Sequence, residues 1–274
     1  MSITLALRHL RDRFKPSDRM PVVFLGHGSP MNAIEDNTYS RAWADLGRSL
    51  PHPAAILVVS AHWMTRGTTL VDVSKLPRTI HDFGGFPDAL FAQQYPAAGA
   101  PDLARDVVAL LGSHRAQEDD TWGLDHGAWS ILKRLYPDAN VPVFQISIDM
   151  TAGLAHQLEI GAAISSLRER GVLILGSGNV VHNLGAMQFD GQPQDFALEF
   201  DALFADRLSQ RDHAALADQN SLGALLRMAH PAVDHYLPAL TVAGASDSRD
   251  TLTFMTDTIA LGSVSMRSFV YHQA

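Results

Sequence analysis

Four short apolar segments in the first two thirds of the chain have the pattern of buried β-strands. Each is a run of consecutive apolar residues, several of them β-branched, and turn residues follow it. Uninterrupted apolar runs of this length are typical of strands that are covered on both faces. The predicted strands span residues 22–25, 54–60, 141–148 and 172–175.

Amphipathic helical patterns lie between these strands. Residues 39–50 form one, residues 102–111 form another, and residues 155–170 form a third that Gly171 ends as a C-terminal capping glycine. Strands that alternate with helices predict βαβ units and a largely parallel sheet. The expected fold is a single α/β domain with a central, mostly parallel or mixed sheet covered by helices on both faces.

The pattern changes after Gly185, where helices dominate. Helical patterns cover residues 196–208, 222–229 and 235–243, and residues 251–255 and 263–270 have the pattern of closing strands. We find no internal repeat or linker, so one domain over residues 21–274 is the simplest interpretation. Residues 1–20 are interpreted as an N-terminal extension, in which the spacing of Leu5, Leu7, Leu10 and Phe14 allows a short amphipathic helix.

Composition narrows the classes of function. The 274 residues are 46% hydrophobic and 18% charged, which is typical of a globular protein, and the net charge is -8 with no Lys/Arg run longer than two. Nucleic-acid and anionic-membrane binding are therefore not expected. No apolar run approaches the ~20 residues of a membrane span, and the N-terminus lacks a secretory signal pattern, so we expect a cytoplasmic protein. Without cysteine there is no thiolate ligand or thiol nucleophile.

Four of the 13 histidines occupy positions suited to a metal site. His27, His62 and His182 follow predicted strands within Gly- or Ser-containing turns, and His235 lies at a predicted helix start. α/β proteins build sites at the carboxyl ends of strands, and imidazole is the commonest protein metal ligand. One such histidine is more often a structural residue, but their recurrence predicts a mononuclear, nitrogen-ligated metal.

Two further segments carry candidate catalytic and substrate-binding residues. Asp125 suits a helix N-cap, which places His126 in the first helical turn, where the positive helix end favours a neutral imidazole that can act as a general base. An incidental histidine in a capping motif is the alternative. His81 and Phe83 lie in an aromatic, glycine-rich loop of the kind that often covers apolar ligands, so both are candidate substrate contacts.

Three common motifs are absent or incomplete. Met31 replaces the third glycine of a G-x-G-x-x-G phosphate loop, and neither a G-x-S-x-G elbow nor an H-E-x-x-H helix occurs. A dinucleotide site, a serine hydrolase and a zincin protease are therefore not indicated.

Six segments in order, GHGSPMN, VVSAHW, TIHDFGGFP, WGLDHGAW, SGNVVHNL and DHYLP, resemble the class III (LigB-like) extradiol ring-cleavage dioxygenases, most of all their 4,5-DOPA extradiol group. The resemblance runs from about residue 21 to residue 270. It implies a single α/β domain whose mononuclear metal is held by His27, His62, His182 and His235, with His126 as the conserved DHG histidine. Many relatives use two histidines and one glutamate, so the resemblance leaves His182 as either a fourth ligand or the acid/base residue.

The resemblance also implies an activity. We expect extradiol cleavage of a catechol, for example L-DOPA to 4,5-seco-DOPA, by O₂ at mononuclear non-haem Fe(II), and Zn(II) can occupy the same site. The partners would be a catecholic small molecule and O₂, and the sequence does not indicate an oligomeric state. Two alternatives stay open, namely a zinc-dependent hydrolase and a non-catalytic metal-binding protein on the same fold.

Overall fold

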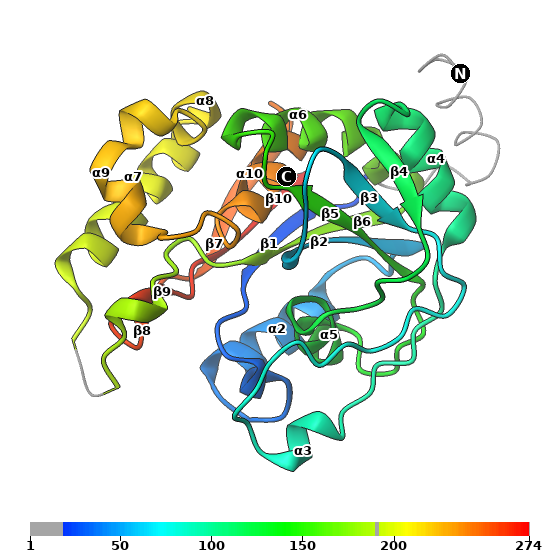
Figure 1. The fold of residues 1–274 in the computed structure, drawn as a ribbon, viewed down its shortest axis with the longest axis horizontal. Helices are drawn as coiled ribbons and strands as arrows, with labels where there is room; N and C mark the ends of the chain where they lie inside the picture. Colours follow the sequence, from blue (N-terminus) through cyan, green and yellow to red (C-terminus); the bar gives the residue numbers. More distant parts are fainter. Residues whose placement is uncertain (1–18, 190–191, 274) are drawn as a thin grey trace.

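The computed structural model describes residues 19–189 and 192–273, which are organised around a central eight-stranded sheet (Figure 1). The strand order is β4-β3-β5-β2-β6-β1-β10-β7. The strands are β1 (Val22–Gly26), β2 (Ala55–Thr65), β3 (Thr69–Asp72), β4 (Ala116–Asp119), β5 (Val143–Asp149), β6 (Val172–Gly178), β7 (Asp250–Thr256) and β10 (Ser268–Gln273). A separate hairpin joins β8 (Ile259–Ala260) to β9 (Val264–Ser265).

The centre of the sheet is parallel and its edges are mixed. β5, β2, β6 and β1 run parallel. On one side β10 is antiparallel to β1 and β7 is antiparallel to β10, and on the other side β3 is antiparallel to β5. The pairing of Gly26 with Gly178 brings the carboxyl ends of β1 and β6 to the same place. The predicted α/β class with a mixed sheet is therefore confirmed.

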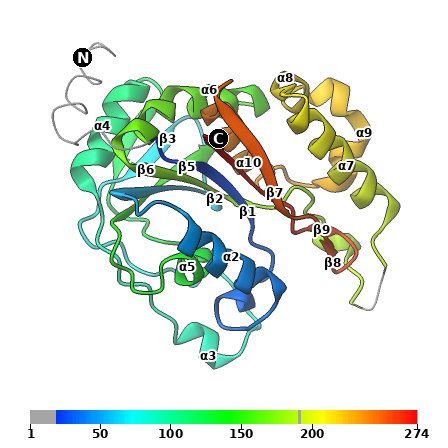
Figure 2. The same ribbon diagram turned by 180° about the vertical axis from the view of Figure 1, so that it is seen from behind.

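Helices cover both faces of this sheet (Figures 1 and 2). α2 (Thr38–Ser49) and α5 (His126–Leu135) lie on one face, and α4 (Pro101–Leu111), α6 (Leu154–Ile164) and α10 (Leu237–Ala245) lie on the other. Side chains alternate along β1, so Val22 and Phe24 join the core beneath the second group while Val23 and Leu25 join the core beneath the first. Burial on both faces explains the uninterrupted apolar strands.

The remaining helices lie around this framework. α7 (Asp195–Ser209), α8 (His213–Leu216) and α9 (Gln219–Ala229) form a group beside β7, as Figure 1 shows. Short helical turns are α3 (Asp88–Phe91), η1 (Pro30–Ala33), η2 (Ser165–Arg170) and η3 (Leu184–Ala186). Among the described residues, no helix combines the length and apolar character needed to cross a bilayer.

Several boundaries differ from the sequence prediction. β2 does not end at Ser60 but continues past a register shift to Thr65, so His62 lies within the strand. The helix predicted over residues 155–170 becomes a 3-10 turn at Ser165, although Gly171 does cap it, with a left-handed φ of 76°. His235 precedes α10 instead of lying within it, and the strand predicted over 263–270 is divided into β9 and β10. The predicted N-terminal helix falls on residues outside the described part.

Candidate metal centre

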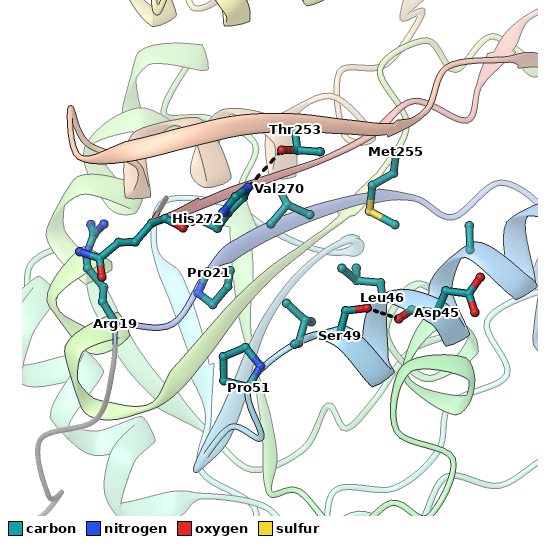
Figure 3. A pocket seen from close by; sticks show the side chains of 13 residues that line it. Arg19, Pro21, Asp45, Leu46, Ser49, Pro51, Thr253, Met255, Val270 and His272 are labelled. Atoms are coloured by element: carbon teal, nitrogen blue, oxygen red, sulfur yellow. Dashed lines mark hydrogen bonds between the residues drawn. The ribbon is translucent and has the colours of Figure 1, made fainter.

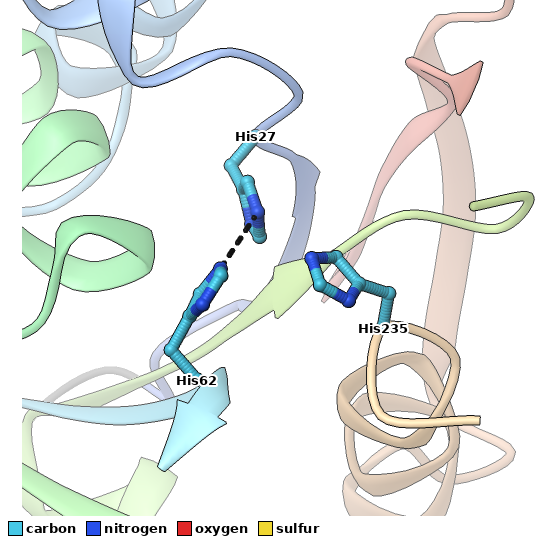
Figure 4. Close-up of side chains that lie close together, drawn as sticks. All are labelled: His27, His62 and His235. Carbon is cyan, nitrogen blue, oxygen red and sulfur yellow. Dashed lines mark hydrogen bonds between the residues drawn. The ribbon is translucent and has the colours of Figure 1, made fainter. Parts of the chain in front are cut away.

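Three histidines from distant parts of the chain converge at the carboxyl edge of the sheet (Figure 4). His27 follows β1, His62 lies in the C-terminal half of β2, and His235 lies just before α10. One donor nitrogen from each ring lies within 4.8 Å of the other two. The Nε2 atoms of His27 and His62 are 3.2 Å apart. Three of the four predicted metal ligands are therefore brought together.

The glycines of two motifs make this convergence possible. A Cβ on Gly178 would lie 2.2 Å from the carbonyl oxygen of His235, so only glycine lets the segment before α10 approach β6 this closely. The backbone N–H of Asn179 donates to that same carbonyl at 2.9 Å. On the other side, Gly28 has a positive φ of 56°, which turns the chain away directly after His27.

A hydrogen-bond chain fixes which nitrogen of His27 faces the other rings. The Ser177 hydroxyl donates to the Gly127 carbonyl at 2.6 Å, so its oxygen is left to accept from Nδ1 of His27 at 2.9 Å. Nδ1 therefore carries the hydrogen, and Nε2, which faces His62, presents a lone pair. This arrangement, with the second ring nitrogen hydrogen-bonded to the protein, is typical of metal-ligating histidines.

Burial keeps the three imidazoles neutral. It lowers the pKa of His27 well below its usual value, and the neighbouring His235 lowers it further. The pKa of His235 is also well below its usual value because of burial and then of His182, and the pKa of His62 is lowered by burial and then by His126. Neutral imidazoles with converging nitrogens are the donor set that Fe, Zn and similar ions take. The residues present therefore fit a bound metal ion.

His182 lies beside this group. Its ring stacks on that of His235, with centroids 3.5 Å apart and planes 5° apart. Among the described residues, two groups of possible donor atoms lie within 4.8 Å of one another, namely His27, His62 and His235, and His62, Asp82 and His126. Neither group contains His182. Burial lowers the pKa of His182 to about 4. Its role as ligand or as acid/base stays a prediction, and its position next to the three-histidine set is relevant to both.

His126 stands at the N-terminus of α5, where the sequence predicted it. Asp125 is the N-cap, and its side chain accepts from the backbone N–H of Ala128. The His126 ring lies 3.9 Å from that of His62, centroid to centroid, and 5.7 Å from that of His27. The predicted base is therefore adjacent to the metal centre.

Asp82 bridges His62 and His126, and the sequence analysis did not select it. Its Oδ1 accepts from the backbone N–H of His126 at 2.9 Å and lies 3.0 Å from Nδ1 of the same residue. Its Oδ2 lies 3.3 Å from Nδ1 of His62. Burial raises the pKa of the Asp82 carboxyl, but its contacts with His126 and His62 outweigh burial and lower it overall. The sequence feature that could have identified Asp82 was the His-Asp pair of the aromatic loop. Ser177 was also missed, and the feature that could have identified it was the Gly-Ser-Gly segment.

The two predicted substrate contacts lie at different distances from the centre. The Phe83 ring lies 5.5 Å from that of His126, within the site. The His81 ring contacts that of Phe83 at 5.8 Å between ring centroids, and its Nε2 is hydrogen-bonded to the carbonyl oxygen of Gln93 at 2.9 Å. The roles of both stay predictions.

A separate groove of about 640 Å³ lies between α2 and the strands β7 and β10 (Figure 3). Leu46, Met255 and Val270 are among its apolar lining residues. None of the converging histidines lines it, so it is not part of the metal centre.

Comparison with known families identifies the class of protein to which this chain belongs. Residues 19–265 match the family model described as the catalytic LigB subunit of aromatic ring-opening dioxygenase. The chain therefore belongs to this family of ring-opening dioxygenases and is an oxidoreductase. The family is metal-dependent, which agrees with the histidine cluster, and its reaction requires a small-molecule substrate and O₂.

Similarity to individual proteins adds detail to the family assignment. The chain is 44% identical over 266 residues to the 4,5-DOPA dioxygenase extradiol of Escherichia coli (strain K12), with 94% of this chain and 97% of that protein covered. It is 34% identical over 230 residues to the 4,5-DOPA dioxygenase extradiol of Beta vulgaris, with 81% and 85% covered. The crystal structure of an uncharacterized protein from Escherichia coli K12 matches with a TM-score of 0.81 at 38% identity, over 93% of this chain and all of that one.

Proposed function

We propose that this protein cleaves the ring of a catechol by the extradiol route, with L-DOPA as the candidate substrate and 4,5-seco-DOPA as the product. The observation that carries the proposal is the convergence of His27, His62 and His235 next to two further histidines in a ring-opening dioxygenase family. Relatives named 4,5-DOPA dioxygenase extradiol support the choice of substrate.

Three protein ligands on one side of a metal ion leave positions open for other molecules. We take His27, His62 and His235 as these ligands and Fe(II) as the native metal, with Zn(II) able to occupy the same site. The bound metal would supply a centre that gathers both catechol oxygens and O₂ and passes electrons between them.

The other residues of the site handle protons and position the ring. His126, beside His62, takes the proton from a catechol hydroxyl, and His182, beside His235, serves as a second acid/base group. Burial lowers the pKa of His182 to about 4, so the imidazole is neutral near pH 7. Phe83 packs against the substrate ring, and His81 contacts Phe83 and holds it in place.

The experiment is oxygen uptake by metal-stripped protein reloaded anaerobically with Fe(II), with Zn(II)-loaded protein as the control. We expect iron-dependent O₂ consumption and a new yellow absorbance with L-DOPA or a simple catechol. No uptake with any catechol at a filled metal site would refute the proposal and favour a zinc hydrolase or a non-catalytic metal-binding protein.

Two variants divide the roles of the histidines. His126→Ala should retain the metal and lose about 10²–10⁴-fold in kcat, the usual contribution of a general base. His182→Ala should also retain the metal, with slower turnover. Loss of the metal from His182→Ala would instead make His182 a fourth ligand.

A further inference from the structure

Asp82 occupies an unusual position, because one carboxylate faces two imidazoles of the site and a helix N-terminus. Its side chain is about one-fifth exposed, whereas that of His126 is 8% exposed. Oδ1 is held by a direct hydrogen bond from the backbone N–H of His126, which fixes the rotation of the carboxylate. Oδ2 is thereby directed at His62.

The orientation of His62 depends on this contact. Its Nδ1 faces Asp82 at 3.3 Å, and its Nε2 faces Nε2 of His27 at 3.2 Å. A carboxylate only accepts hydrogen bonds, so the hydrogen of the His62 ring belongs on Nδ1. Nε2 then presents its lone pair to the metal.

The same reasoning applies to His126. Its Nδ1 lies 3.0 Å from Oδ1 of Asp82, without the alignment of a linear hydrogen bond, and has no other partner. A hydrogen on Nδ1 is stabilised by the carboxylate, whereas a lone pair there would face another lone pair. Nε2 of His126 is then the nitrogen that is free to accept a proton.

We propose that Asp82 is a positioning residue that sets the tautomer and orientation of His62 and His126 together, one through each carboxylate oxygen. The effect of Asp82 on catalysis rests on the function proposed above. Its effects on the tautomers of the two rings and on metal affinity do not depend on that function. A single carboxylate thereby links a metal ligand to the catalytic base.

Asp82→Asn is the sharpest test, because the structure dictates how an amide would sit. The amide oxygen must face the backbone N–H of His126, since an NH₂ group there would oppose another donor. The NH₂ group is then turned toward Nδ1 of His62 and favours the tautomer whose Nε2 carries the hydrogen. We expect metal affinity to fall about 10- to 100-fold, the usual effect of losing such a partner. Because the amide oxygen still holds His126, kcat at saturating metal should change less.

Asp82→Ala removes both contacts. Metal affinity should fall by a similar factor, and kcat at saturating Fe(II) should fall more than in Asp82→Asn because His126 also loses its support. Asp88→Asn is the matched control: it makes the same chemical change at an exposed position nearby in the sequence, at the start of α3. It should retain wild-type affinity and turnover.

The measurements are Zn(II) affinity by chelator competition, zinc stoichiometry, and ¹⁵N–¹H NMR of the imidazoles in zinc-loaded protein. The proposal requires hydrogen on Nδ1 of both His62 and His126 in the wild type. It is overturned by hydrogen on Nε2 of either ring, or by Asp82→Asn binding zinc as tightly as Asp88→Asn. Two zinc ions in the wild type and one in Asp82→Ala would also overturn it, because Asp82 would then be a ligand. These readouts do not require ring cleavage, so they decide the role of Asp82 even if no catechol is consumed.

Discussion

Replacing Ser177 with alanine tests whether the hydrogen bond to His27 contributes to metal binding. The Ser177 hydroxyl accepts from Nδ1 of His27 at 2.9 Å and donates to the carbonyl of Gly127 at 2.6 Å. Ser177→Ala removes one oxygen atom and leaves the backbone of β6 unchanged. His27 then has no partner on Nδ1, and its ring is free to rotate or to adopt the other tautomer.

The size of the expected effect follows from what a hydrogen-bond partner of a metal-ligating histidine contributes to metal binding. Losing one weakens metal binding by about 10- to 100-fold, or about 1.4–2.7 kcal/mol. At a metal concentration 1,000 times the wild-type Kd, bound metal stabilises the native protein by about 4.1 kcal/mol. In the variant this stabilisation falls to about 2.7 kcal/mol for a tenfold loss and about 1.4 kcal/mol for a hundredfold loss. The rise in Tm on adding metal should therefore shrink by roughly 2–5 °C.

The assay is thermal unfolding with excess Zn(II) and with a chelator, for the wild type, Ser177→Ala and Ser147→Ala. Ser147 is the matched control, since its buried hydroxyl accepts from the backbone N–H of Leu70 at 2.7 Å and contacts Thr65 at 2.9 Å, away from the metal centre. Ser147→Ala should lower Tm equally with and without metal. If Ser177→Ala shows the full wild-type rise in Tm on adding zinc, the hydrogen bond to His27 does not support metal binding.

Two predictions concern the stability of the fold. Asp250→Ala should lower the free energy of unfolding, measured by urea denaturation, by about 3–5 kcal/mol, because it leaves the fully buried Arg168 without its counter-charge. The control is Asp45→Ala, which breaks an exposed ion pair and should lower the free energy of unfolding by at most about 1 kcal/mol. His230 is buried, which lowers its pKa to about 4, so between pH 6.5 and pH 4 the unfolded chain binds a proton that the native state does not. Its stabilising contribution is present above pH 6.5 and is lost as the pH falls, by about 3 kcal/mol at pH 4, and His230→Gln should reduce this slope in unfolding measured across that range. An unchanged slope in the variant would show that His230 is not the titrating group.

The strands of the sheet could be predicted because burial on both faces leaves a clear pattern. Val22 and Val23 pack into opposite cores, so both must be apolar. The same reasoning explains why β4 was missed: its sequence Ala-Gln-Glu-Asp occupies the sheet edge, where Gln117 and Glu118 are exposed and the pattern is polar. β3, only four residues long, lacks an apolar run of the length that identified the central strands.

Some of the histidines could be selected from sequence because they lie next to a recognisable structural boundary. His27 follows the end of β1 and His126 begins α5, as their local sequences indicate. His62 was selected for a partly wrong reason, since β2 continues through it beyond a register shift that the local sequence does not reveal. The position of His182, whose ring stacks on that of His235 outside the three-histidine set, is a property of the tertiary packing.

The partners of these histidines lie in different motifs from the histidines themselves, which is why sequence spacing did not reveal them. Ser177, from the motif that contains His182, binds His27 and the carbonyl of Gly127 in the motif of His126. Asp82, from the aromatic loop, contacts both His62 and His126. Two of the motifs therefore contribute a group that orients a side chain of another, and a substitution in one should alter the chemistry of its neighbours. For His27 and His62 this gives a physical reason for the motifs to occur together, because a metal-binding histidine without its partner from another motif would not have its nitrogen lone pair held toward the metal.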